Sequence, residues 1–180
     1  MFNKLIDLLI EFIGLFQCFV YVDEYEKGVV LRQGRFHRTV GPGMRWILPL
    51  NLEQVLVDNS KPAPMYLDVQ SIPTLDDYAC NIQVGVIWRI WDIKTWIIDI
   101  EDAEDMLGML CSGVVYDVLQ ETKWVDAGNK AFKKALIKKM NKLANELGAE
   151  IGEVVIQDFA TGGADRIWHE GISIGLGFEG

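Results

Sequence analysis

The sequence predicts an α+β fold in which an antiparallel β-sheet is followed by two helices and one closing strand. Two observations predict it. Between Gly28 and Asp92, apolar and polar residues largely alternate, which is typical of strands with one buried face. Beyond Lys94, apolar residues recur every three or four positions, as in helices, before "AEIGEVVIQDF" reads as one more strand. Strands, then helices, then a strand is an α+β order.

Residues 1–22, "MFNKLIDLLIEFIGLFQCFVYV", predict a membrane-associated helix. Asp7 and Glu11 interrupt the apolar run, so its charge-free part is shorter than the about 20 residues that a spanning helix needs. The same acids argue against a secretory signal. On a helix, the polar residues form one narrow stripe on an apolar cylinder, which suits a membrane interface. The expected membrane-binding side chains are Phe2, Leu5, Ile6, Leu9, Phe12, Ile13, Phe16 and Phe19. The alternative is a helix that covers the domain's own core.

Several strands are expected between Gly28 and Ile90. "GVVLRQGRFHRTV" predicts a hairpin around Gln33-Gly34. Gly-Pro-Gly at 41–43 predicts a turn, and "MRWILPL", "EQVLVD" and "MYLDVQSI" predict further strands. The strand in "YACNIQVGVIWRIWD" alternates most clearly. Its expected buried face is formed by Cys80, Ile82, Val84, Val86, Trp88 and Ile90.

Two helices follow. "DIEDAEDMLGMLCSGVVYDVLQ" has acids in its first turn, where the helix dipole favours them. Its expected apolar stripe is Met106, Leu107, Leu110, Val114 and Leu119. Asp126 or Asn129 can cap the second helix, "KAFKKALIKKMNKLANEL", which Gly148 is expected to end. Its expected inward residues are Phe132, Leu136, Met140, Leu143 and Leu147, with six lysines outward.

The charge distribution predicts two interaction surfaces. The formal net charge of −9 argues against general nucleic-acid binding. Five cations nevertheless follow the N-terminal segment, and we expect them to face anionic lipid head groups on the cytoplasmic side of a membrane. They are Lys27, Arg32, Arg35, Arg38 and Arg45. The alternative is that they pair with this chain's own acids.

The second expected surface joins copies of the chain. Helices packed on a common sheet leave their charged faces outward, so a lysine face of one copy can meet the acids of the next in a ring. The expected residues are Lys133, Lys134 and Lys138 with Glu101, Asp102 and Asp105. The alternative is that both faces are simply hydrated.

No reactive constellation is visible, so neither enzymatic activity nor a cofactor or metal is expected. His37 lies among arginines, and His169 has no partner pattern. Asp76-Asp77 reads as a turn, and Cys111 as a packed thiol. The three cysteines have no CxxC spacing, which indicates a reducing compartment.

The chain from about Val22 to Phe159 resembles the SPFH (Band 7) family of stomatins, prohibitins and flotillins. The matching segments are "EYEKGVVLRQGRF", "VGPGMRWILPL", the "V.D" after it, "T.DDY...IQVGVIWRIWD" and "ELGAEIGEVVIQDF". The resemblance implies a membrane-anchored scaffold that assembles into rings or cages, often around membrane proteases or channels, and is not a catalyst.

Three departures from the family pattern shape the expectation. The first helix lacks the usual arginines, and the N-terminal segment looks more like the partly inserted stomatin hairpin than a full span. The sequence ends in a glycine-rich stretch where the family begins a long coiled coil, so a short form with a shallow ring is expected. The expected segments are the membrane helix (1–22), an SPFH-like domain (23–160) and an irregular tail (161–180). The alternatives are a ring component of a phage or virus particle, or a soluble ligand-binding domain.

Overall fold

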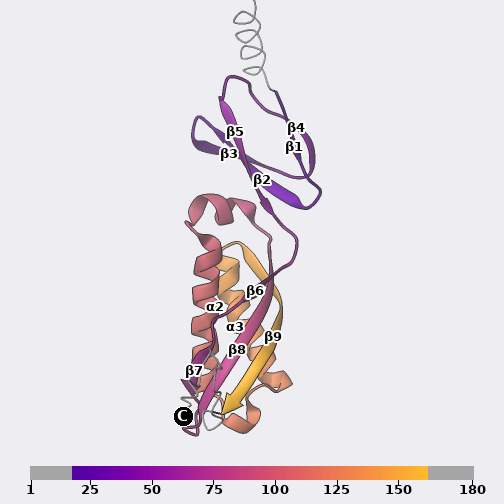
Figure 1. Cartoon of the computed structure of the whole chain (residues 1–180). Helices are drawn as coiled ribbons and strands as arrows, with labels where there is room; N and C mark the ends of the chain where they lie inside the picture. The colour runs from indigo at the N-terminus through magenta and orange to yellow at the C-terminus, as the bar shows by residue number, and fades with distance from the viewer. Residues whose placement is uncertain (1–17, 162–180) are drawn as a thin grey trace, which may run out of the picture.

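The structure, a computed structural model, describes residues 18–161. Residues 1–17 of the helix expected at 1–22, and residues 162–180 of the irregular tail expected at 161–180, lie outside these residues. Thr161, the first residue of the expected tail, belongs instead to the closing strand. So do seven expected membrane-binding side chains, those of Phe2, Leu5, Ile6, Leu9, Phe12, Ile13 and Phe16. Figure 1 shows an elongated molecule. One end consists of strands alone (residues 18–59, the strand end), and the other contains the two longest strands and the two long helices (residues 63–161, the helical end).

The strand end contains two small antiparallel sheets. Its strands are β1 (Phe19–Val22), β2 (Glu26–Arg32), β3 (Arg35–Val40), β4 (Gly43–Trp46) and β5 (Glu53–Asn59). β1 pairs with β4, and β2 lies between β3 and β5. The predicted hairpin is confirmed: Gln33 and Gly34 join β2 to β3 with φ of 51° and 77°, the positive values that a two-residue hairpin turn requires.

The predicted helix over residues 1–22 is wrong at its end, because Phe19–Val22 form strand β1. Phe19 lies opposite Trp46 in the β1–β4 pair, and β-branched and aromatic residues favour this extended, half-buried setting. Val22 packs with Val30 and Val40 in a small apolar core. The folded domain therefore begins upstream of the expected boundary at residue 23.

The helical end is built on one long strand. Its strands are β6 (Ala63–Tyr66), β7 (Gln70–Pro73), β8 (Ala79–Ile90) and β9 (Ala149–Thr161). β9 pairs with β8 from Cys80 to Ile90, so β6 and β7 share the other edge of β8, one after the other along it. The predicted buried face of β8 is confirmed, since all six of its side chains are 7% exposed or less.

Two antiparallel helices cover this buried face (Figure 1). α2 (Ala103–Gln120) packs beside β7, and α3 (Lys130–Glu146) packs beside β9. Short turns, η1 (Thr95–Asp99) and η2 (Trp124–Asp126), precede them. α2 begins later than the sequence suggested because Asp102 has left-handed φ and ψ of 49° and 52°.

The helix ends follow local chemistry. Of the two predicted caps for α3, Asn129 is the one used, and its side chain accepts a hydrogen bond from the Phe132 amide at 2.8 Å. Gly148 ends the helix with φ of 79°. Most expected inward residues are buried or half-buried, but Met106 is wrong: it lies on the outer side of α2 and is 37% exposed.

The two ends meet at a defined junction. Trp96 Nε1 donates to Asp58 Oδ2 at 3.0 Å, which joins η1 to β5. The amides of Trp91 and Asp92 donate to the Gly148 carbonyl at 3.0 and 3.1 Å. The start of α2 and the end of α3 therefore both lie near this junction (Figure 1).

Candidate functional site

Four of the five cations expected at lipid have partners within the strand end or the junction. Lys27 Nζ lies 3.5 Å from the Trp91 carbonyl oxygen. Arg45 donates to two carbonyl oxygens of the turn before it, at 2.9 and 2.7 Å. Arg35 is exposed and has no ion pair or side-chain hydrogen bond to the described residues. Arg35 is thus the member of the set best placed to contact a ligand.

Arg32 and Arg38 converge on one buried acid, Glu53. The Glu53 side chain is 0% exposed, and its Oε1 accepts from Arg32 Nε at 3.0 Å and Nη2 at 2.7 Å. Its Oε2 accepts from the Leu48 amide at 3.1 Å and lies 3.5 Å from Arg38 Nη2. His37 Nε2 is 3.9 Å from Oε1. Arg32 and Arg38 thus pair with the chain's own acid, while their side chains stay 43% and 37% exposed.

The environment of Glu53 keeps it ionised. Burial by itself raises the pKa of this carboxyl, but the hydrogen bonds from Arg32 and from the Leu48 amide, with the nearby charge of Arg38, outweigh it. The net result is a Glu53 pKa below its ordinary value. A charged Glu53 holds β2, β3 and the start of β5 together, and it orients two guanidinium groups that still reach solvent.

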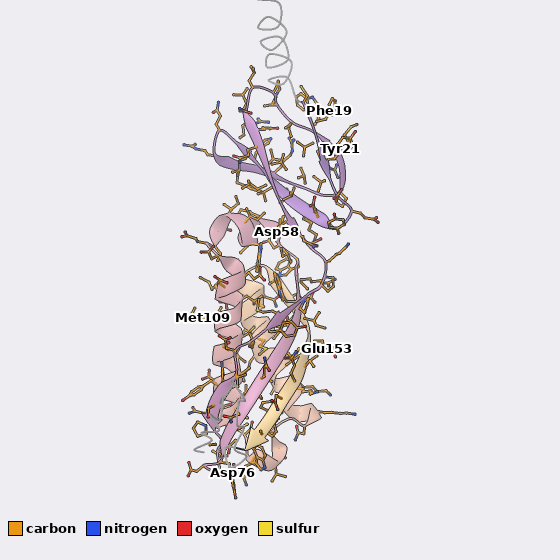
Figure 2. All side chains as sticks on the ribbon, viewed as in Figure 1. Phe19, Tyr21, Asp58, Asp76, Met109 and Glu153 are labelled. Atoms are coloured by element: carbon orange, nitrogen blue, oxygen red, sulfur yellow. The ribbon has the colours of Figure 1, made fainter. Side chains whose placement is uncertain are left out.

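The β1–β4 pair presents an exposed apolar surface. Phe19 lies opposite Trp46 and Tyr21 opposite Met44, so all four side chains point to the same side of the two-stranded ribbon. They are 50%, 54%, 75% and 57% exposed, respectively. We call these four residues the ribbon face. Figure 2 shows Phe19 and Tyr21 at the opposite end of the molecule from Asp76.

The ribbon face has the composition of a membrane-interface surface. Tyr and Trp rings combine an apolar body with a polar edge and are enriched at the level of lipid head groups. Leu50 and Leu52, in the loop between β4 and β5, add two more exposed apolar side chains to the strand end. The guanidinium groups described above belong to the same end. Apolar and cationic groups thus occur together where residues 1–17 join the domain.

The acids and lysines expected to join copies lie far apart within one chain. Glu101, Asp102 and Asp105 lie at the start of α2, near the junction, whereas Lys133 and Lys134 lie in the first turns of α3, at the far end of the helical end. None of the six expected residues has an ion pair among the described residues. The neighbouring Lys139 does pair internally, with Glu121 at 2.8 Å.

The residues considered for chemistry in the sequence have structural roles where the structure describes them. These residues contain no group of three His, Cys, Asp or Glu side chains that could hold a metal ion. Burial raises the pKa of Cys80 to about 11 and that of Cys111 to about 12, so both thiols are protonated and packed in the core. Asp76 accepts from Thr74 Oγ1 at 2.6 Å and from the Trp124 amide at 3.0 Å, which makes it a turn residue.

The comparison with protein families identifies this architecture. The model described as "SPFH domain / Band 7 family" matches residues 20–162. The chain belongs to the SPFH domain / Band 7 family. The match begins inside β1, which agrees with Phe19–Val22 being part of the folded domain.

Named relatives of this SPFH domain come from organisms that are distant from one another. Protein HflK of Haemophilus influenzae is 25% identical over 151 residues, which are 77% of this chain and 35% of that protein. Human stomatin-like protein 3 is 24% identical over 150 residues, 81% of this chain and 51% of that protein. Stomatin-1 of Caenorhabditis elegans is 26% identical over 108 residues, 59% of this chain and 32% of that protein. The chain thus spans about a third to a half of these relatives.

The SPFH domain also contains candidate site residues that the sequence analysis did not single out. Tyr21, Met44, Trp46 and Glu53 were not among the expected residues. A signal for the first three does exist, because "FVYV" and "GMRW" place large apolar residues at alternate positions. No helix within residues 18–161 is long and apolar enough to cross a membrane.

Proposed function

We propose that this protein is a non-enzymatic scaffold that binds the cytoplasmic face of a cell membrane through its strand end. There it assembles with further copies, or with a related SPFH protein, into a ring that organises lipids or a membrane protease or channel. The main observation in favour is the ribbon face, with four large apolar side chains that are each at least half exposed. The apolar segment of residues 1–17 joins the domain next to these side chains.

The ribbon face supplies enough apolar surface for membrane binding. Full burial of a large apolar side chain is worth about 1.5–3 kcal/mol. Because about half of each side chain is already covered, burying the rest of all four contributes about 3–6 kcal/mol before ordering costs. This contribution does not depend on lipid charge, so it applies equally to neutral and anionic membranes.

The cations add a preference for anionic lipid. Arg35 is fully available, and attraction of one cation to an anionic surface is worth about 1 kcal/mol. Arg32 and Arg38 contribute less, since Glu53 cancels part of their charge. We therefore propose that apolar contacts supply most of the affinity and that Arg35 supplies most of the charge preference.

Vesicle flotation of the full chain tests this function. Tyr21→Ser with Trp46→Ser removes two exposed members of the ribbon face. The matched control is Leu75→Ser with Tyr78→Ser, which removes two similarly exposed apolar side chains near Asp76 at the opposite end. We expect the ribbon variant to lose binding to neutral and anionic vesicles by tenfold or more, a loss of about 1.4 kcal/mol, and the control to bind like the parent. Equal binding by both variants would contradict the proposal.

The N-terminal contribution needs a deletion that respects β1. Removing residues 1–17 leaves Phe19–Val22 to pair with β4, whereas removal through Val22 would also destroy the ribbon. We expect the 1–17 deletion to float with vesicles less well than the full chain, without unfolding of the domain. A circular dichroism spectrum unchanged in the strand and helix regions checks the folding.

A further inference from the structure

A groove runs between β6 and the first half of α2, on the outer side of the helical end. We call it the acidic groove. Its volume is about 470 Å³, and its main lining residues are Met65, Tyr66, Asp68, Glu104, Asp105 and Met109. Tyr66 and Met109 are 64% and 66% exposed, so apolar surface is open to solvent there. Figure 2 shows Met109 on the outer side of α2.

The rim of the acidic groove carries unneutralised charge. Asp68, Glu104 and Asp105 are exposed, and among the described residues their side chains have no ion pair and no hydrogen bond. α2 itself contains no Lys or Arg from Ala103 to Gln120. The surface therefore combines an apolar floor with three acids, and it favours an occupant with long cationic side chains.

The second helix of the same domain, α3, offers such side chains. Lys134, Lys138 and Lys142 follow one another at four-residue intervals on α3, so they form one stripe on the helix surface. All three are exposed and have no ion pair among the described residues. We call them the lysine stripe. Lysine stems lie well on apolar surface while their ammonium groups reach acids at its rim.

The topology places the acidic groove and helix α3 at opposite edges. The acidic groove lies at the edge formed by β6 and β7, and α3 packs beside β9 at the other edge of β8. Met109 and Glu153 mark these two edges in Figure 2. The groove and the stripe therefore do not meet within one chain, but two copies standing side by side bring them together.

The two surfaces also lie at compatible heights. Because α2 and α3 are antiparallel, Glu104 and Asp105 at the start of α2 are near the junction, and so is Lys142 near the end of α3. Lys138 is one turn further away. Lys133 and Lys134 are further still, so only the second half of the stripe is level with the groove when neighbouring copies stand parallel.

We propose that the acidic groove of one copy receives the lysine stripe of a second copy, with Lys138 and Lys142 opposite Asp68, Glu104 and Asp105. The contact joins different surfaces of the two partners, and such heterologous contacts close into rings when the rotation allows. This inference rests on the assembly part of the proposed function. It moves the expected contact from Lys133 and Lys134 toward the end of α3.

A charge-swap experiment with the full chain tests the contact. One variant carries Glu104→Lys and Asp105→Lys, and the other carries Lys138→Glu and Lys142→Glu. In each variant alone, like charges face each other, so we expect the concentration needed for assembly to rise by tenfold or more. Mixing the two variants restores both contacts in an alternating ring, because the reversed groove of one variant meets the reversed stripe of the other, and the two unchanged surfaces also meet. Recovery of large particles in the mixture also shows that both variants are folded.

The matched control separates this contact from other lysine contacts. Lys130→Glu with Lys133→Glu changes two lysines of the same helix outside the proposed contact, and we expect it to assemble like the parent. Particle size is measured by light scattering in detergent at low salt. If the parent is large and the groove variants stay equally large, this contact is wrong while assembly stands. If the parent itself is a monomer at every concentration, both the contact and the proposed assembly are wrong, whereas membrane binding is judged separately by flotation.

Discussion

Glu53→Gln is the substitution from which the structure predicts the clearest effect on stability. The carboxylate is 0% exposed and accepts two hydrogen bonds from Arg32 and one from the Leu48 amide. The amide side chain keeps the shape of Glu53 but removes its charge. It also places an NH2 group where one of two acceptor oxygens stood, so at least one donor in the cluster loses its partner.

The magnitude follows from the number and exposure of these contacts. A hydrogen bond to a charged group contributes about 1.5–3 kcal/mol when it is buried. Arg32 is 43% exposed, so water screens its two bonds and the discounted loss is about 1 kcal/mol for the pair. The Leu48 amide is half-buried, and a mismatch there costs about 1 kcal/mol more. We expect Glu53→Gln to lower the free energy of unfolding by about 2 kcal/mol at pH 7.

The pH dependence gives the same prediction a second signature. The folded-state pKa of Glu53 lies below its ordinary value of 4.5, so its stabilising contribution is present above that value. The contribution is lost as the pH falls through the folded-state pKa. The difference in stability between the parent and Glu53→Gln should therefore shrink in acid.

Urea unfolding followed by circular dichroism, at pH 7 and again below pH 4, measures both effects in one detergent. The reasoning about the Glu53 cluster would be refuted if the parent and Glu53→Gln differ in unfolding free energy by less than about 0.5 kcal/mol at pH 7. It would also be refuted if that difference grows in acid.

Two further predictions use single substitutions. Arg35→Gln should weaken binding to anionic vesicles by about fivefold, since one cation is worth about 1 kcal/mol at such a surface, and should leave binding to neutral vesicles unchanged; an equal loss on both would exclude a charge contact. Gly148→Ala should destabilise the domain by about 2 kcal/mol or more, because the residue has φ of 79° and an added Cβ would lie 2.5 Å from the Asp92 carbonyl oxygen; urea unfolding at pH 7 measures it, and an unchanged midpoint would contradict the strain.

Much of the helical end was predictable from the sequence because its signals are long and local. The twelve residues of β8 alternate apart from Gly85 and Ile87, and every residue of the predicted face is buried. The Asn129 cap and the Gly148 stop depend only on their near neighbours. Met106 was assigned wrongly because α2 has apolar residues on more than one side, so periodicity alone did not mark the buried face.

The strand end was less predictable because its site forms between distant segments. Phe19 and Trp46 become neighbours only when β1 pairs with β4, and a four-residue strand after an apolar segment reads locally as more helix. Glu53 meets Arg32 and Arg38 only through the β2–β5 pairing and the β2–β3 hairpin. Periodicity gives no information on such pairings, so the sequence leaves open whether Arg32 and Arg38 face lipid or pair with the chain's own acids.

The central claim is that the ribbon face enters the membrane interface while the opposite end of the domain stays in water. An environment-sensitive fluorophore attached at Tyr21→Cys reports on the first location, and the same fluorophore at Tyr78→Cys reports on the second. Both positions are exposed, at 75% and 54%, and the native Cys80 and Cys111 are buried. Cys18 is only half-buried, so both labelled variants also carry Cys18→Ser. On addition of vesicles, we predict a blue shift and stronger emission at position 21 and no change at position 78. An unchanged spectrum at position 21, under conditions where the labelled protein floats with the vesicles, would contradict the account.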